Sequence, residues 1–134
     1  MACFQFHDLG SIPYADALEL QTTAFDKLVD SKTKGGGEKN HLFFCEHEPV
    51  LTIGKHGKES NLLIPESLLR EKGITFYHVS RGGDITYHGP GQIAGYPVFD
   101  LECWNMGLRQ YIYNLEEIMI RFLALYGLKG ERLD

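Results

Sequence analysis

Glycine, arginine and histidine residues are concentrated in one short stretch of the sequence, SRGGDITYHGPGQIAGY at residues 80–96, which holds five of the chain's 15 glycines. Gly82 and Gly83, directly after Arg81, permit positive backbone φ angles. They also let a ligand approach main-chain N–H groups that a Cβ atom would otherwise screen. The stretch can therefore form a cradle for an anion or for a carbonyl oxygen.

The residues between the two glycine turns alternate sides if the backbone is extended. Asp84, Thr86 and His88 then share one face, with Ile85 and Tyr87 on the other. Two tight turns around a short strand would explain the same glycines, and glycine spacing alone favours that structural interpretation.

Two side chains of the stretch have structural interpretations as well. Arg81 can be a surface or ion-pairing residue, and His88 can be a hydrogen-bonded core histidine. Their position beside the glycines favours a functional role, but spacing does not decide the question.

Cysteine and metal chemistry have weaker support. The sequence CEHE at residues 45–48 contains metal-ligand types, but consecutive strand residues point to opposite faces and cannot all bind one ion. A catalytic cysteine needs a neighbouring base, and nothing local to Cys3, Cys45 or Cys103 supplies one. Their odd number and wide spacing fit reduced thiols, so we expect neither a metal site nor a disulfide.

The elements that must position this stretch follow from hydrophobic periodicity and from turn residues. An amphipathic helix is expected from Pro13 to residue 29, with Ser11 as a candidate N-cap, followed by an exposed glycine-rich loop at 30–40. Pro97 indicates an edge strand or a bulge. The further expected elements are strands at 41–46, 50–53, 74–79 and 92–101, a short helix at 65–72 and a long helix from 108 to a C-cap at Gly127.

Length and charge limit the possible classes of protein. The chain has 134 residues, is 43% hydrophobic and carries a formal charge of −5, which fits one globular domain over residues 1–134. The negative charge argues against a broad nucleic-acid surface. Without a signal peptide or an apolar run of about 20 residues, a cytoplasmic protein that does not enter membranes is expected.

Three segments resemble one enzyme family. EHEPVLTIGKHG at residues 46–57 and RGGDITYHGPGQIAGYPVFDL at 81–101 closely resemble the lipoyl(octanoyl)transferase family, the octanoyl-[acyl-carrier-protein]:protein N-octanoyltransferases. YNLEEIMIRFLALYGL at 113–128 is similar to the family's following segment. The resemblance covers the chain from the first helix onward and outweighs the purely structural interpretation.

The resemblance implies an α+β fold, a mixed β-sheet flanked by helices as in lipoate and biotin protein ligases. It also implies that residues 81–88 form one wall of the acyl-substrate pocket. The substrate-binding residues expected on this basis are Arg81, Gly82, Gly83, Asp84, Ile85, Thr86, Tyr87 and His88.

The implied activity belongs to lipoate biosynthesis and protein lipoylation. An octanoyl group moves from the thioester of acyl carrier protein to a lysine of a lipoyl domain through an acyl-cysteine, without cofactor or metal. The implied partners are octanoyl-acyl carrier protein, the lipoyl domains of 2-oxoacid dehydrogenase complexes and the glycine cleavage H protein. Lys55, Lys58 and Arg81 are candidates for a local basic docking patch.

The family's cysteine and lysine lie in segments that have no counterpart before Asp134. No catalytic residue is therefore assigned, and we expect residues 1–134 to be the truncated N-terminal part of a longer catalytic domain and inactive alone. A lipoate or biotin protein ligase, which must bind ATP, is the alternative enzyme. A non-catalytic module that binds lipoyl domains or acyl carrier protein is the alternative without chemistry.

Overall fold

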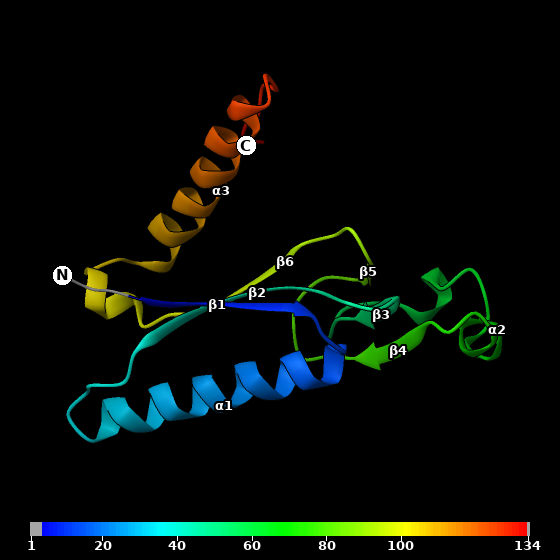
Figure 1. Ribbon diagram of the computed structural model, residues 1–134, viewed down its shortest axis with the longest axis horizontal. Helices are drawn as coiled ribbons and strands as arrows, with labels where there is room; N and C mark the ends of the chain where they lie inside the picture. Colours follow the sequence, from blue (N-terminus) through cyan, green and yellow to red (C-terminus); the bar gives the residue numbers. More distant parts are fainter. Residues whose placement is uncertain (1–3, 134) are drawn as a thin grey trace. The chain divides into compact units, whose positions relative to one another are not determined.

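The computed structural model describes residues 4–133, which form two compact units (Figure 1). The first unit reaches to Val98 and the second runs from Phe99 onward. The expectation of one domain over the whole chain stays a prediction. Among the described residues, the first unit holds strands β1 to β6 and helices α1 and α2, and the second holds helix α3.

The first sheet consists of β1 (Phe4–Ser11), β2 (Asn40–Glu46) and β6 (Ala94–Val98), in the order β1-β2-β6. Strand β1 is parallel to β2, and β6 is antiparallel to it. No strand was expected at residues 4–11. Pro97 lies on the outer strand β6, as its missing N–H group predicts.

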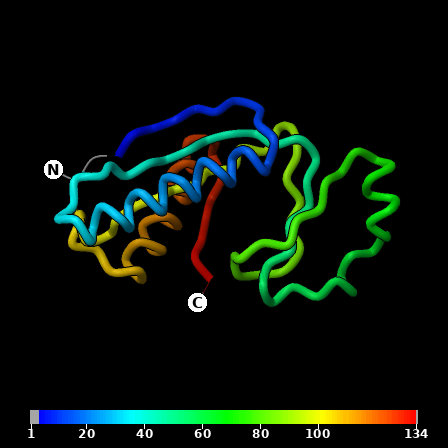
Figure 2. The backbone as a smooth tube through the Cα atoms, turned by 90° about the horizontal axis from the view of Figure 1, so that it is seen from below, coloured from blue at the N-terminus to red at the C-terminus, as the bar shows by residue number. Residues whose placement is uncertain are grey.

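Helix α1 (Tyr14–Thr33) lies along this sheet in both Figure 1 and Figure 2. Its buried residues Ala17, Ala24 and Leu28 share one face because they are spaced seven and four positions apart. They pack with Phe43, Cys45, Ala94 and Val98 of the sheet. This layer of side chains forms the core between α1 and the first sheet.

Both ends of α1 differ from the expectation. Ser11 is the last residue of β1, so its assignment as N-cap was wrong, and Pro13 occupies the N-cap position. The helix continues four residues past Val29, and the Thr33 hydroxyl donates to the Asp30 carbonyl in its last turn. The following glycines, with φ between +84° and +120° at residues 35–37, end it.

The second sheet consists of β3 (Val50–Ile53), β4 (Thr75–His78) and β5 (Ile85–His88), in the order β4-β3-β5. Strand β3 is parallel to β4 and antiparallel to β5. A short helix, α2 (Glu66–Glu71), precedes β4, and a 3₁₀ turn, Glu59–Asn61, follows β3. These elements agree with the expected order, and with the first sheet they make the α+β fold with mixed sheets.

The two sheets are joined by one interrupted antiparallel ribbon. Strand β2 continues into β3, and β5 returns into β6. The pair Cys45 and Ala94 marks one side of the interruption, and the pair Val50 and His88 marks the other. Four residues, 46–49, are therefore opposed by five, 89–93, so the ribbon has a bulge at this point.

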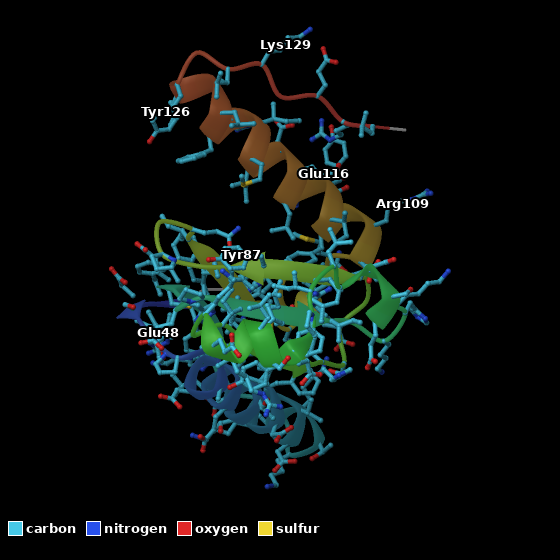
Figure 3. All side chains as sticks on the ribbon, turned by 90° about the vertical axis from the view of Figure 1, so that its right-hand side faces the viewer. Glu48, Tyr87, Arg109, Glu116, Tyr126 and Lys129 are labelled. Carbon is cyan, nitrogen blue, oxygen red and sulfur yellow. The ribbon has the colours of Figure 1, made fainter. Side chains whose placement is uncertain are left out.

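The second unit contains a 3₁₀ turn, Leu101–Trp104, and helix α3 (Leu108–Leu125), with Arg109 in its first turn and Tyr126 just past its end in Figure 3. Gly127 has φ +71° and donates to the Ala124 carbonyl, while the Leu128 amide donates to Leu123. This bonding is a complete Schellman motif, so the C-cap prediction is confirmed.

The segment after α3, which had no expected structure, folds back onto the helix. Arg132 donates to Glu116 and Glu117 at 3.2 and 2.7 Å, and its guanidinium lies 3.9 Å from the centre of the Tyr113 ring. Among residues 4–133, no helix is both long and apolar enough to cross a lipid bilayer.

A histidine pair on the first sheet predicts a pH-dependent stability. His7 Nε2 lies 3.0 Å from His41 Nδ1, and burial, followed by the neighbouring His7, lowers the pKa of His41. The unfolded chain therefore takes up the proton first as pH falls, so this contribution is present above about pH 6.5 and is lost below it. Urea unfolding at pH 7.5 and 5.5 should show lower stability at pH 5.5.

The matched variant is His41→Gln, which cannot ionise. It should lose less stability than the wild type between the two pH values. An equal loss in both proteins would assign the pH dependence to other groups.

Candidate acyl-substrate site

Arg81 connects the glycine-rich loop to the second sheet. Its Nη2 donates to the Thr52 hydroxyl at 2.7 Å, to the Thr52 carbonyl at 3.0 Å and to the Asp84 carbonyl at 2.8 Å. Its Nη1 donates to the Gly82 carbonyl at 2.8 Å. The guanidinium is thus bound within the protein, which argues against Arg81 as part of a free basic docking patch.

The loop at residues 81–83 wraps around the buried Gly54. A Cβ atom at Gly54 would lie 2.8, 2.7 and 2.5 Å from the carbonyl oxygens of Arg81, Gly82 and Gly83. All three carbonyl groups therefore lie close to this glycine. The Lys55 amide fixes the loop further by donating to the Arg81 carbonyl at 3.0 Å.

The amide groups of the loop face the other way. A trans peptide plane holds its C=O and N–H groups in opposite directions, and the described residues contain no cis peptide bond. The N–H groups of Gly82, Gly83 and Asp84 therefore point away from Gly54. None of the three donates a hydrogen bond within residues 4–133.

Backbone angles separate the two glycines of the loop. Gly83 has φ +83°, whereas Gly82 is not among the residues with positive φ. The prediction that the turn needs a positive φ holds for Gly83 only.

Asp84 is fixed by the loop that follows β3. Asn61 Nδ2 donates to one carboxylate oxygen, and the Lys58 amide donates to the other at 3.2 Å. These contacts, with that of Asn61 the strongest, hold the pKa of Asp84 below its usual value. Asp84 therefore stays an acceptor-only carboxylate at neutral pH and positions the loop at residues 57–61.

Thr86 and His88 lie on one face of the second sheet, as strand alternation predicts. The register pairs Thr86 with Thr52 and His88 with Val50, and paired residues share a face. Tyr77 of β4 pairs with Thr52 from the other side. Since Arg81 binds Thr52, the side chains on this face form a row that extends from the glycine-rich loop to His88 at the end of β5.

Aromatic rings continue this polar face toward α1. The Tyr14 ring lies 5.2 Å from Tyr77 and 5.4 Å from His47, and His47 lies 6.0 Å from His88. Burial raises the pKa of Tyr14, while the charge of Arg81 acts in the opposite direction. Tyr14 thus stays a neutral hydroxyl at physiological pH.

Ile85 and Tyr87 occupy the opposite face of β5. They pair with Ile53 and Leu51, and Tyr87 is 50% exposed (Figure 3). The structure thus places Thr86 and His88 on one face of the strand that follows the loop of Arg81, and Ile85 and Tyr87 on the other face, while the Asp84 carboxylate binds the loop at residues 57–61.

His47 is as completely buried as Thr52. It is 1% exposed, its Nδ1 lies 2.9 Å from the Ile12 carbonyl and its Nε2 lies 2.8 Å from the Tyr96 hydroxyl. A carbonyl only accepts, so Nδ1 carries the proton and Nε2 accepts from Tyr96. The Ile12 carbonyl therefore fixes His47 Nδ1 as a hydrogen-bond donor.

Cys45 does have a base beside it, so the expectation of none was wrong. Its sulfur lies 3.5 Å from His47 Nε2, because residues two apart on an extended chain share a face. Burial raises the pKa of this thiol, and Tyr96 already donates to the same nitrogen. These contacts favour a neutral thiol in the core. Cys103 is exposed, and Cys3 lies outside the described residues.

The described residues contain no group of three or more histidine, cysteine or acidic side chains arranged to hold a metal ion. The side chains of the sequence CEHE do not converge on one point. Glu46 accepts from the Gly91 amide at 2.6 Å, His47 is buried and Glu48 is exposed (Figure 3).

Sequence reasoning missed Thr52, Gly54, Tyr14 and His47 as parts of the site. One available signal was the glycine directly after β3, because a glycine that ends a strand often marks a close approach of another backbone. The contacts of Tyr14 and His47 join residues more than 30 positions apart, which no local pattern indicates.

The chain belongs to the lipoyl protein ligase A/B catalytic domain family, whose model matches residues 13–134. It is 71% identical over its full length to an octanoyltransferase of Parabacteroides distasonis, of which it covers 61%. It is 54% identical over 129 residues to an octanoyltransferase of Porphyromonas gingivalis, covering 96% of this chain and 26% of that protein. The chain thus spans less than two thirds of these relatives.

Solved structures confirm the fold. A putative lipoate protein ligase of Thermoplasma acidophilum with bound lipoic acid has a TM-score of 0.61 at 18% identity, covering 96% of this chain and 50% of that one. Lipoate-protein ligase A bound with ATP has a TM-score of 0.61 at 20% identity, covering 100% and 52%. At such identities the likeness concerns the fold alone.

Proposed function

We propose that this chain forms the acyl-substrate wall of an octanoyltransferase of lipoate biosynthesis. The observation that carries the proposal is the loop at residues 81–84, whose three outward amide groups have no acceptor within residues 4–133. Oriented N–H groups of this kind stabilise a carbonyl oxygen that gains negative charge. The Parabacteroides and Porphyromonas relatives are named octanoyltransferases, which supports the transfer of an octanoyl group.

The reaction consists of two successive acyl-transfer steps. A cysteine thiolate attacks the thioester of octanoyl-acyl carrier protein, the old C–S bond breaks and the carrier thiol leaves. A lysine amine then attacks the acyl-cysteine, forms the amide and releases the cysteine while a base takes the amine proton. We assign that cysteine and its supporting lysine to the part of the relatives that this chain does not span.

The residues of this chain bind and orient the acyl group in both steps. Gly82 and Gly83 present donors to the carbonyl oxygen, and His88 orients the thioester or the incoming lysine. Arg81 and Asp84 keep the loop in place through the contacts described above.

The partners belong to the same proposal. A bipartite lipoate protein ligase of Thermoplasma acidophilum has been solved in a study that includes its E2 lipoyl domain, with a TM-score of 0.65 at 17% identity, covering 100% of this chain and 49% of that one. We propose lipoyl domains as acceptors, acyl carrier protein as donor and the cytoplasm as location. Lys55 and Lys58, both exposed, remain candidates for docking the acidic carrier protein.

The test uses a chimera in which this chain replaces the matching part of the Parabacteroides distasonis octanoyltransferase. We expect His88→Ala to lower octanoyl transfer to a lipoyl domain by about 10²- to 10⁴-fold, the range typical for a positioned acid–base group. Gly83→Val should also lower it, because φ +83° strains valine and its Cβ would lie 3.1 Å from Arg81 Nη1.

The matched control is His78→Ala, a histidine on β4 whose side chain is 62% exposed, which should retain the wild-type rate. The unextended chain should show no transfer, because we assign the reacting cysteine to the part of the relatives that it does not span. Wild-type rates in both His88→Ala and Gly83→Val would exclude the assigned site.

A lipoate ligase is the second candidate, because the family model that matches this chain describes a lipoyl protein ligase A/B catalytic domain. A ligase activates a free acid with ATP, whereas a transferase uses a thioester. Transfer from octanoate and ATP by the chimera, without acyl carrier protein, would support the ligase.

A further inference from the structure

The His88 ring has one defined hydrogen bond. Its Nδ1 lies 2.9 Å from Gln92 Oε1. An amide oxygen only accepts, so Nδ1 carries a proton, and in the neutral form of the ring the lone pair is then on Nε2. Nε2 has no partner within residues 4–133, so it is the nitrogen that can meet a substrate.

The turn that carries Gln92 is itself fixed to the neighbouring strand. The Gln92 amide donates to the Gly89 carbonyl at 3.1 Å, and the Gly91 amide donates to the Glu46 carboxylate at 2.6 Å. Gly91 has φ +84°, which suits glycine. The Gln92 side chain therefore starts from a backbone that is held at two points.

His47 contacts the same ring from the core. The two imidazole rings meet edge to face, with 6.0 Å between centroids and an interplanar angle of 71°. His47 cannot move away easily, because it is buried and bonded to Ile12 and Tyr96. The His88 ring is thus packed by one residue and hydrogen-bonded by another.

We propose that Gln92 is a positioning residue that holds His88 in its Nδ1–H tautomer, so that the Nε2 lone pair faces the incoming amine. This role rests on the proposed function. In the amine-attack step, His88 Nε2 accepts a hydrogen bond from the lysine nitrogen and so orients it as the new C–N bond forms. The C–S bond to the cysteine breaks, and the amine proton passes to the base named above. Gln92 acts through His88 and does not touch the acyl group.

The direct test is the tautomer of His88 in this chain, read from two-bond proton–nitrogen correlations of ¹⁵N-labelled protein near pH 8.5, about two units above the ordinary histidine pKa. The wild type should show the Nδ1–H form. Gln92→Leu, which removes the acceptor, should shift His88 toward the Nε2–H form. Gln92→Glu, which keeps an oxygen acceptor, should retain Nδ1–H.

His47 is the internal control, because its Nδ1–H tautomer depends on Ile12 and should be the same in all three proteins. A change at His47 would mean that Gln92→Leu disturbs the fold. The His88 tautomer in Gln92→Glu would then test the proposal, which expects the Nδ1–H form and is contradicted by the Nε2–H form. An Nε2–H form of His88 in the wild type, or an unchanged His88 tautomer in a folded Gln92→Leu variant, would overturn the proposal.

Activity separates this proposal from the proposed function. In the chimera, Gln92→Leu should lower kcat by about tenfold, less than the loss for a missing acid–base group, with KM unchanged. A chimera without any octanoyl transfer would refute the function but leave the tautomer result standing. Full kcat in Gln92→Leu, with the tautomer shifted, would refute the positioning role alone.

Discussion

Replacing Gly54 by valine is expected to lower the free energy of unfolding by about 3 kcal/mol, at the upper end of overpacking costs. The new Cβ would overlap three carbonyl oxygens of the loop at residues 81–83, all closer than 3.0 Å. Backbone atoms cannot rotate out of the way as a flexible side chain can. The loop must therefore leave β3, which also breaks the hydrogen bond from Lys55 to Arg81.

Urea unfolding of the chain measures this effect, and the matched control is Gly82→Ala. A Cβ at Gly82 meets no atom within 4 Å, and its φ is not positive, so stability should change by no more than about 0.5 kcal/mol. In the chimera, Gly54→Val should also lose octanoyl transfer. Equal stabilities for the two variants would show that the loop does not pack on Gly54.

Replacing Arg81 by methionine is expected to cost about 2 kcal/mol of folding stability and to release the loop. The change keeps an apolar stem but removes donors from the Thr52 hydroxyl and from three carbonyl groups. Thr52 is 1% exposed, so its oxygen atoms have little access to water in compensation. Leaving buried acceptors unpaired costs about 1–3 kcal/mol.

Arg81→Lys should recover only part of the loss, because one ammonium group cannot reproduce the fork of a guanidinium. The control is Arg70→Met, whose arginine forms an exposed pair with Glu66 and should matter by less than about 1 kcal/mol. Amide exchange at Lys55, whose N–H group donates to the Arg81 carbonyl, gives a local measurement of how firmly the loop is held. Exchange rates in Arg81→Met like those of Arg70→Met would contradict the role of Arg81.

The elements predicted best were those whose signals are local. Helix α3 has apolar residues at helical spacing and the glycine of a Schellman motif, so both its body and its end could be read from the sequence. The alternation of side chains along residues 84–88 predicted that Thr86 and His88 lie on the opposite face of the strand from Tyr87. The register of β5 with β3 confirms this prediction.

The features that sequence reasoning missed depend on contacts between distant residues. Strand β1 exists because it pairs with β2 more than 30 positions away, and that pairing makes Ser11 a strand residue rather than a cap. Arg81 was judged by its flanking glycines, but its partner Thr52 lies 29 positions earlier. His47 approaches Cys45 because both side chains turn to the α1 side of the sheet.

The bulge between the two sheets restricts how the chain can change length. Along β2 the buried apolar residues, Phe43 and Cys45, are odd-numbered, whereas along β3 the buried residues include the even-numbered Val50 and Thr52. Opposite them, His88 and Ala94 are both even-numbered. The numbering of the buried face therefore changes from odd to even between β2 and β3 but stays even between β5 and β6. The one extra residue in the segment 89–93 is what lets both sheets belong to a single ribbon.

Deleting one residue between Gly89 and Ile93 would turn either His88 or Ala94 to the wrong face, since a shift by one position inverts every side chain of a strand. The glycine loop at residues 34–39 has no partner strand to match and is free of this restriction. Insertions and deletions should thus accumulate in that loop during evolution, while the five-residue spacing from His88 to Ala94 stays fixed.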